Sequence, residues 1–540
     1  MKDISSTGSF INFYLNNYIY VDKTQYIRDL IKLERVFISR PRRFGKSLTL
    51  DTIATLFETG VEPYFKGTWI YDKWTEPTYP VLRLNFLDLD KYSLEHFKQK
   101  LNAIISSFAR DINVKNYEEK VEPEDTIYFL LDELRKEKRQ IVILIDEYDC
   151  QMTANINNET LYKQFQEKIK SFYASIKNKW PIKFLGITGV TRLKDVEIFS
   201  IGSDINDITN DSVYSQMIGF TRDEIKKYYI DYLTLAASYE NKCRVEEVTD
   251  TQIESMLDMM AQNYDGYCFD EFYKKKVFST WSVNKFFQSV VSNKFVYFGE
   301  YWYDNGGLPS ILVNYLKTHE LNIFEYLDKD KFLKVSSDDF KNPTALTTIN
   351  QNVLMCQTGY LTLRSDLNKT STVALGIPNG EIYKALNRLL ANNIFKGNTD
   401  ITDDYGRSLL EVGTVDDIIN LFNSALNSVS YDNYPIVSES SVQNMLKLYL
   451  LGAHQKVLSE VHEAKGRADL VVNTDNRRIV FEFKYAKNET EAKSKLLDAV
   501  EQIKTRDYGN IVPKKTELLR IATVFNADPK VRAFTEFQLV

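Results

Sequence analysis

The chain has few cysteines and histidines, which limits the disulfide and metal chemistry that it can support. Its 540 residues include four cysteines and four histidines. The cysteines, Cys150, Cys243, Cys268 and Cys356, show neither close pairs nor the spacing of metal ligands. We therefore expect reduced thiols in a reducing compartment and no histidine-rich zinc site.

Two further features are absent: an apolar run of membrane length and an excess of positive charge. No segment approaches the ~20 apolar residues of a membrane span, and the N-terminus lacks an apolar run of signal-peptide length. These absences predict a soluble, cytoplasmic protein with no membrane partner. Because the net charge is −6, any contact with nucleic acid must depend on a local basic patch.

The composition that remains is that of a globular protein. Apolar residues make up 44% of the chain and charged residues 26%, as in soluble proteins with buried cores. A chain of 540 residues is too long for one ordinary core. We expect roughly two to four domains.

The stretch from Val36 to Leu50 has the layout of a phosphate-binding loop. A short run of β-branched and aromatic residues stops at Arg40-Pro41, and an apolar helical pattern begins after Gly45-Lys46-Ser47. In this layout, backbone N–H groups at a helix start and one lysine hold the β and γ phosphates of a nucleotide. The predicted nucleotide contacts in the loop are Arg43, Phe44, Gly45, Lys46, Ser47 and Leu48. The usual pattern has glycine where this chain has Arg40, so the partners of the loop must decide the assignment.

A later strand carries acids that suit such a loop. Five consecutive aliphatic residues, 141–145, indicate a strand buried on both faces of a parallel sheet, and Asp146-Glu147 follow directly. Sheets of this kind bind ligands outside the carboxyl ends of their strands. Asp146 is therefore a candidate Mg²⁺ ligand together with Ser47, and Glu147 can orient an attacking water. The alternative is that the two acids only end a strand and cap a loop.

A third buried strand, residues 183–187, ends in Thr188. A polar residue at that strand end can sense the γ-phosphate, so Thr188 is our candidate. Arg192 follows closely and either neutralises phosphate charge or is a solvated loop arginine. Together the segments predict a parallel sheet flanked by helices.

At this point the chain resembles a known family. The segments YVDKTQYI, SRPRRFGKSL, ILIDEYD and GITGVTRL look like the AAA-ATPase-like domain of a family of bacterial proteins. That family belongs to the wider P-loop ATPases with an additional strand and a catalytic glutamate. The resemblance implies ATP binding, with Lys46 on the phosphates, Ser47 and Asp146 on Mg²⁺, and Glu147 polarising water. An Arg-Pro pair in place of the first glycine is itself typical of that family.

Residues 221–430 are interpreted as a helical lid and connecting module. Thr221 and Glu224 suit a capping box at the start of the helical patterns. Aromatic stretches at 263–269 and 357–361 are more often core than a ligand platform. We assign no catalytic role to this region, and we predict an ATPase-like domain at 1–220 and a C-terminal domain at 438–540.

The C-terminal domain combines strand patterns with charged residues. Glu482 and Lys484 alternate with aromatic residues, so the period of a strand places both on one face. An antiparallel neighbour carrying Asp469 would bring a third charged group alongside. Two close carboxylates need a cation, for which oxygen ligands favour Mg²⁺ or Mn²⁺, and the lysine can orient a water or stabilise negative charge. The alternative is a surface strand with alternating charges.

The surroundings of these residues resemble the PD-(D/E)xK nuclease superfamily. The stretch GRADLV precedes an apolar strand with E-F-K, and Gln502 follows in a helix near Tyr508. More narrowly, this resembles the nuclease-like domain that accompanies the ATPase-like domain described above. The resemblance implies Asp469 and Glu482 as metal ligands, Lys484 as the catalytic lysine and Gln502 as a substrate-positioning residue. Basic residues near the site either contact a phosphate backbone or form a solvated helix face.

These features predict an α/β protein. Its expected parts are an N-terminal P-loop ATPase sheet flanked by helices, a helical middle and a C-terminal restriction-endonuclease-like α/β domain. The predicted function is that of an ATP-binding, ATP-hydrolysing protein whose nucleotide state controls a Mg²⁺-dependent nuclease, with DNA favoured over RNA and an oligomer compatible with this ATPase class. One alternative is a nucleotide-gated nucleic-acid-binding, sensor or scaffold protein with a non-cleaving domain. Another is a plain ATPase with an inert C-terminal domain.

Overall fold

The computed structural model describes most of the chain as two compact units. The described residues are 1–192, 204–302, 310–316, 319, 323–343, 345–395, 404–453, 455–463, 466–506, 508 and 517–540. Unit 1 consists of Met1–His319 and Phe332–Ile382, and unit 2 of Glu320–Lys331 and Tyr383–Val540. Each unit has its own five-stranded sheet and buried core.

A parallel sheet forms the centre of the first part of unit 1. Its strands are β1 (Arg35–Ser39), β2 (Val81–Asn85), β3 (Ile141–Asp146), β4 (Ile182–Gly189) and β5 (Asn206–Asp207), in the order β2-β3-β4-β1-β5. All neighbouring strands are parallel, which confirms the predicted sheet. The order places the carboxyl ends of β1, β3 and β4 next to one another. The phosphate loop, Asp146-Glu147 and Thr188 therefore meet at one edge of the sheet.

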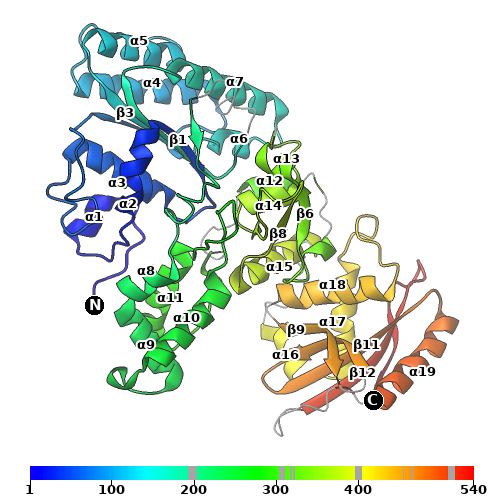
Figure 1. Ribbon diagram of the computed structural model, residues 1–540. Helices are drawn as coiled ribbons and strands as arrows, with labels where there is room; N and C mark the ends of the chain where they lie inside the picture. The colour runs from blue at the N-terminus through cyan, green and yellow to red at the C-terminus, as the bar shows by residue number, and fades with distance from the viewer. Residues whose placement is uncertain are drawn as a thin grey trace. The chain divides into compact units, whose positions relative to one another are not determined.

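Helices cover both faces of this sheet. They are α1 (Phe10–Leu15), α2 (Thr24–Leu30), α3 (Lys46–Thr59), α4 (Leu94–Asp111), α5 (Pro123–Lys136), α6 (Cys150–Ala154) and α7 (Glu159–Ile176), with short 3-10 turns η1 (Ile31–Leu33) and η2 (Phe86–Asp88). Figure 1 shows α4, α5 and α7 together on one side of the sheet and α1 to α3 on the other. In α4 the buried Phe97, Leu101 and Ile105 recur every four residues and so share one face. This covering explains why every residue of β1 and β3 is buried.

A helical module with its own core follows in unit 1. It contains α8 (Arg222–Tyr228), α9 (Ile230–Asn241), η4 (Val245–Glu247), α10 (Asp250–Tyr264) and α11 (Thr280–Asn293). Thr221 and Glu224 form the predicted capping box at the start of α8. Leu233, Met256 and Phe287 are among the residues buried between these helices. The helical middle of the prediction is thus present.

The remainder of unit 1 contains a small antiparallel sheet that the sequence did not reveal. Its strands are β6 (Leu333–Ser336), β7 (Thr362–Leu363) and β8 (Thr372–Gly376), in the order β6-β8-β7, and the helices near it are α12 (Ser310–Leu316), α13 (Ser337–Lys341) and α14 (Gln351–Gln357). Strands of two to five residues are too short to show the alternation by which a strand is found in a sequence.

Unit 2 is built on a mixed sheet. Its elements are η6 (Ile323–Glu325), α15 (Gly380–Ile394, beginning in unit 1), α16 (Asp404–Val412), α17 (Val415–Asn427), α18 (Glu439–Gly452), β9 (Lys456–Glu463), β10 (Gly466–Asn473), β11 (Arg477–Ala486), α19 (Glu489–Arg506), β12 (Glu517–Asn526) and β13 (Ala533–Leu539). The strand order is β13-β12-β11-β10-β9. Only β11 and β12 are parallel, and α19 lies in the crossover that such a pair needs. The strands predicted for Asp469 and Glu482 and the helix predicted for Gln502 are present as β10, β11 and α19.

Within the described residues, we find no helix that combines the length and the apolar character needed to cross a membrane.

Candidate functional sites

The loop between β1 and α3 has the backbone of an anion site. Arg43 has a φ of 65° and Gly45 a φ of 105°, both in the left-handed region, and α3 begins directly afterwards at Lys46. Left-handed residues within such a loop turn successive N–H groups toward the same side, where they form a concave nest for an anion. Gly45 is suited to this conformation because it has no Cβ. The backbone of the loop is therefore suited to an anion, and phosphate binding by these residues stays a prediction.

Lys46 is turned back into the loop. Its Nζ donates to the carbonyls of Arg40 at 3.1 Å and Pro41 at 3.3 Å, and it lies 3.5 Å from Oε1 of Glu147. The side chain is only 4% exposed. The ammonium group thus has oxygen partners from this chain, and phosphate oxygens would have to replace them.

Three of the predicted nucleotide and Mg²⁺ residues contact one another. Ser47 Oγ donates to Oδ2 of Asp146 at 2.5 Å, and Thr188 Oγ1 donates to Oδ1 of the same carboxylate. The three side chains come from the start of α3 and from the ends of β3 and β4. A hydroxyl and a carboxylate in contact form the oxygen donor set that suits Mg²⁺. The hydroxyl of Thr188 orients Asp146, which is a different contact from the one predicted with the γ-phosphate.

Glu147 occupies a strained and half-buried position. Its φ of 52° lies in the left-handed region, which is costly for a residue with a Cβ. Burial raises the pKa of its carboxyl, while the charge of Lys46 opposes the rise and Asp149 and Asp146 add to it. A carboxylate with a raised pKa beside the loop is a candidate for accepting a proton from water.

Arg40 has a structural role in place of the usual glycine. Its guanidinium donates to the carbonyls of Ser39 at 2.8 Å and Thr209 at 2.7 Å, and it lies 4.1 Å from the ring centre of Phe269. Because the side chain is only 1% exposed, burial lowers its pKa to about 9. The arginine thus links the end of β1 to the Thr209 carbonyl. Arg192, for which two roles were open, forms an ion pair with Asp207.

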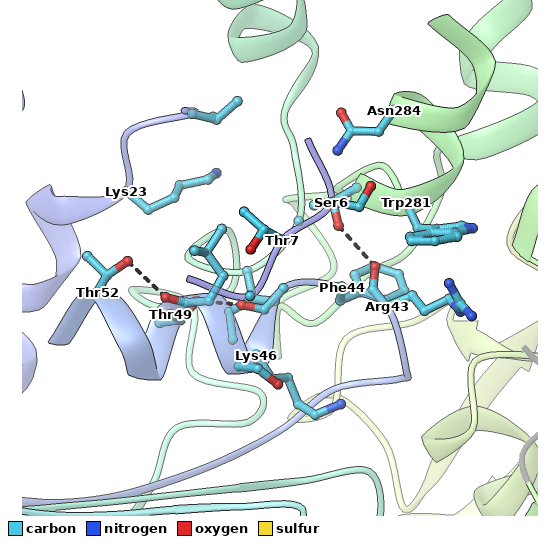
Figure 2. A pocket seen from close by; sticks show the side chains of 18 of the residues that line it. Ser6, Thr7, Lys23, Arg43, Phe44, Lys46, Thr49, Thr52, Trp281 and Asn284 are labelled. Carbon is cyan, nitrogen blue, oxygen red and sulfur yellow. Dashed lines mark hydrogen bonds between the residues drawn. The ribbon is translucent and has the colours of Figure 1, made fainter. Parts of the chain in front are cut away.

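A cavity of about 490 Å³ opens beside the phosphate loop. The loop residues 42–49 and Glu147 line one part of it. Figure 2 labels Arg43, Phe44, Lys46 and Thr49 of this loop. Much of the remaining wall comes from residues to which the sequence pattern assigned no role: Ser5, Ser6, Thr7, Tyr20, Lys23, Trp281 and Asn284. Lys23 belongs to the YVDKT segment, and its Nζ donates to Oε2 of Glu224 at 2.6 Å. The YVDKT segment, which stands out in the sequence, could therefore have pointed to Tyr20 and Lys23 in this wall.

The second site lies in unit 2, where β10 and β11 separate. Their last paired residues at this end are Leu470 and Phe481, and one further step brings Asp469 opposite Glu482. Beyond that point, Oδ2 of Asp469 accepts the backbone N–H of Phe483 at 2.9 Å. Lys484 Nζ donates to Oε1 of Glu482 at 2.8 Å. The fold therefore brings together the three charged residues predicted for this site.

The buried surroundings of Glu482 destabilise the charged form of its carboxyl group. Its side chain is 1% exposed, and its Oε2 is buried without a hydrogen-bond partner among the described residues. Burial and the nearby Asp469 raise its pKa to about 7, although Lys484 opposes the shift. A bound divalent cation would supply the missing partner of Oε2, so the donor set fits Mg²⁺ or Mn²⁺.

Glu439 is a third acid at this site that sequence reasoning missed. It is the first residue of α18, and its Oε1 lies 3.6 Å from Nζ of Lys484. Burial lowers the pKa of Lys484, but hydrogen bonding and charge from Glu482, with Glu439 and Asp469, outweigh it and raise the pKa. The available signal in the sequence was Ser438, which suits a helix N-cap and so places Glu439 in the first turn of a helix. Across the described residues, however, no three histidine, cysteine or acidic side chains close around one point that could hold a metal ion.

Gln502, the predicted substrate-positioning residue, belongs to a polar cluster at the end of α19. Its Nε2 donates to the hydroxyl of Tyr508 at 3.4 Å, and Arg506 Nη1 donates to the same oxygen at 2.9 Å. The charges of Glu482 and Asp469 are among the causes that raise the pKa of Arg506. This cluster therefore lies within electrostatic reach of the acids.

Comparison with known families agrees with both predicted domain types. Residues 5–199 match a family described as predicted AAA-ATPase, and residues 437–534 match the PD-(D/E)XK nuclease superfamily. The chain carries an AAA-ATPase-like domain and a PD-(D/E)XK nuclease-like domain. The nuclease-like match contains Asp469, Glu482, Lys484 and also Glu439.

A curated relative extends over both domains. It is a protein of Azotobacter chroococcum mcd 1 named "Uncharacterized protein in vnfD 5'region", 25% identical over 532 residues, which are 95% of this chain and 94% of the relative. A solved structure titled as the crystal structure of Cdc6p from Pyrobaculum aerophilum is 12% identical and covers 68% of this chain and 93% of its own, with a TM-score of 0.23. A likeness at that score carries no argument about the fold.

The match to the AAA-ATPase-like domain does not include the whole cavity wall. Thr280, Trp281 and Asn284 line the cavity but lie outside residues 5–199. The helical module therefore contributes to the site of the AAA-ATPase-like domain.

Proposed function

We propose that the AAA-ATPase-like domain binds ATP with Mg²⁺. The observation that carries this proposal is the contact of Ser47 and Thr188 with Asp146 beside the nest of the phosphate loop. The backbone N–H groups of residues 43–48 and the ammonium of Lys46 would bind the phosphates. Ser47 and Asp146 would hold Mg²⁺, which neutralises phosphate charge when bound.

Hydrolysis would depend on an exchange of partners at Lys46. When Lys46 moves to the phosphates, it gives up the loop carbonyls and Glu147. Glu147 is then free to orient a water and accept its proton, for which its raised pKa is suited. The domain is accordingly proposed to turn ATP over as well as bind it.

The nuclease-like domain is proposed to cleave phosphodiester bonds, in DNA rather than RNA. Asp469 and Glu482 would hold Mg²⁺ or Mn²⁺, and the unpartnered Oε2 of Glu482 supports this assignment. A bound divalent ion polarises a phosphodiester and lowers the pKa of a bound water. Lys484, held between Glu482 and Glu439, would orient that water or stabilise the developing charge.

The proposed role of ATP is to control this cleavage. Support comes from the presence of both sites in one chain and from a relative that aligns with nearly all of it. We propose that the nucleotide state of the AAA-ATPase-like domain sets the activity of the nuclease-like domain. An oligomer is part of the same proposal, as it is common among such ATPases.

A nicking assay tests the nuclease half. Purified protein is incubated with supercoiled DNA, and separately with RNA, in Mg²⁺ or Mn²⁺. Wild type is expected to cut DNA, whereas Asp469→Ala and Lys484→Ala should lose cleavage with nearly unchanged DNA affinity. A protein that binds ATP but cuts neither nucleic acid would contradict the proposal.

One observation favours a second candidate function. Because no three acidic or other metal-binding side chains close around one point in the described residues, the domain could instead bind nucleic acid without cutting it. A nucleotide-gated binding protein of this kind would show ATP-dependent DNA affinity in the absence of divalent metal. In that case Asp469→Ala would change neither DNA affinity nor its ATP dependence.

A further inference from the structure

The phosphate loop is held in place by residues far downstream in unit 1. Phe44 packs edge-on against Tyr267 with ring centres 4.7 Å apart, and the guanidinium of Arg43 lies 3.9 Å from the ring centre of Trp281. Pro41 lies so close to Gly359 that a Cβ there would be 2.8 Å from the Cβ of the proline. Much of the loop therefore rests on residues after 220, outside the AAA-ATPase-like match.

Two of these contacts act on the loop backbone itself. Trp302 Nε1 donates to the carbonyl of Arg42 at 3.3 Å, and Thr280 Oγ1 donates to the carbonyl of Arg43 at 3.0 Å. In a planar trans peptide, the carbonyl of one residue and the N–H of the next point in opposite directions. Fixing the Arg42 carbonyl therefore fixes the N–H of Arg43, and fixing the Arg43 carbonyl fixes the N–H of Phe44.

Those two N–H groups are among the proposed phosphate donors. Arg43 stands in the left-handed region, where its two neighbouring peptide planes are not held by regular secondary structure. Side-chain hydrogen bonds to their carbonyls reduce the freedom of both planes before a ligand arrives. Preorganised donors bind an anion more tightly than donors that must be ordered on binding.

A buried carboxylate connects the two donors to each other. Glu381, which is 1% exposed, accepts the backbone N–H of Trp302 at 2.8 Å and the hydroxyl of Ser282 at 2.7 Å. Ser282 lies two residues after Thr280 in the first turn of α11. One carboxylate thus links the residue that binds the Arg42 carbonyl with the helix turn that binds the Arg43 carbonyl.

We propose that Thr280 and Trp302, linked through Glu381, are positioning residues for nucleotide phosphates. They fix the peptide planes that contain the Arg42 and Arg43 carbonyls. The N–H groups in those planes belong to Arg43 and Phe44 and are the proposed phosphate donors. The inference rests on the proposed ATP binding. The aromatic stretches of the middle region contact the same loop, through Tyr267 against Phe44 and through Gly359 next to Pro41.

The test compares Thr280→Val, which removes the hydroxyl and keeps the shape, with Thr280→Ser, which keeps the hydroxyl. Mg-ADP affinity and the KM and kcat for Mg-ATP are measured on the full chain. Thr280→Val should weaken Mg-ADP binding and raise KM by about fivefold to tenfold with kcat nearly unchanged. Thr280→Ser should restore wild-type values. Thr234→Val is the matched control, because among the described residues that hydroxyl donates only to the Ile230 carbonyl, within α9.

The results separate failure of the inference from failure of the proposed function. If wild type and Lys46→Ala bind Mg-ADP equally poorly, the proposed ATP binding fails. If Lys46→Ala loses binding but Thr280→Val matches wild type, or Thr280→Ser is as weak as Thr280→Val, the positioning role is overturned. If Thr280→Val does not fold, Trp302→Phe tests the hydrogen bond to the Arg42 carbonyl instead. Unchanged Mg-ADP affinity in Trp302→Phe would overturn the inference.

Discussion

At the scale of residues, each of the two sites has an acid beside a lysine, half-buried in the first site and buried in the second. Glu147 lies 3.5 Å from Lys46, and Glu482 lies 2.8 Å from Lys484. In both cases burial raises the pKa of the acid and the lysine opposes that rise. Charged groups in such positions are costly for folding and typical of functional sites. We infer that both sites hold their charges at a cost to stability that a ligand would reduce.

This cost makes the stability of the metal-free protein depend on pH. The pKa of Glu482 is about 7 in the fold against 4.5 for the ordinary carboxyl. The native state therefore binds more protons than the unfolded state between these values, and stability falls as pH rises through that window. The loss above pH 7 is on the order of 3–4 kcal/mol. Glu482→Gln should remove it.

The measurement is denaturant unfolding of unit 2 in EDTA at about pH 5 and pH 8. We expect Glu482→Gln to be more stable than wild type at the higher pH and to lose that advantage at the lower one. Glu501→Gln, an exposed acid on α19, is the control and should follow wild type. Equal pH dependence in Glu482→Gln and wild type would contradict the assignment.

At the scale of elements, local patterns predicted most strands and helices correctly. The strands β1, β3 and β4 were predictable because each is a short run of apolar residues. β6 to β8 were missed because they are so short. Glu439 and Trp302 were missed because each reaches its site only through the fold, 45 residues before Lys484 and 260 residues after Arg42. Sequence spacing holds no signal for such contacts.

The phosphate loop allows a prediction at this scale. A Cβ at Gly45 would meet nothing within 4 Å, so only the φ of 105° opposes a side chain there. Gly45→Ala should therefore lower the free energy of unfolding of unit 1 by about 1–2 kcal/mol through backbone strain alone. Gly8→Ala is the control, since Gly8 has equal space and no left-handed φ. An unchanged denaturation midpoint in Gly45→Ala would show that the loop is not held in this conformation.

At the scale of the whole molecule, sequence predicted the two domain types because each motif lies within a recognisable local pattern. The boundaries 1–220, 221–430 and 438–540 stay a prediction, as do the roles of the site residues. What the sequence could not supply is the set of contacts between distant segments of unit 1. Glu381, for example, accepts the backbone N–H of Trp302, a residue 79 positions earlier in the chain.

The measurement that tests the central claim is DNA cleavage with and without ATP. It compares wild type with Lys46→Ala and Lys484→Ala in Mg²⁺. We predict that ATP changes the cleavage rate of wild type, that Lys46→Ala cuts at a rate indifferent to ATP, and that Lys484→Ala does not cut in either condition. Cleavage by wild type and Lys46→Ala at the same rate, with the same response to ATP, would contradict nucleotide control.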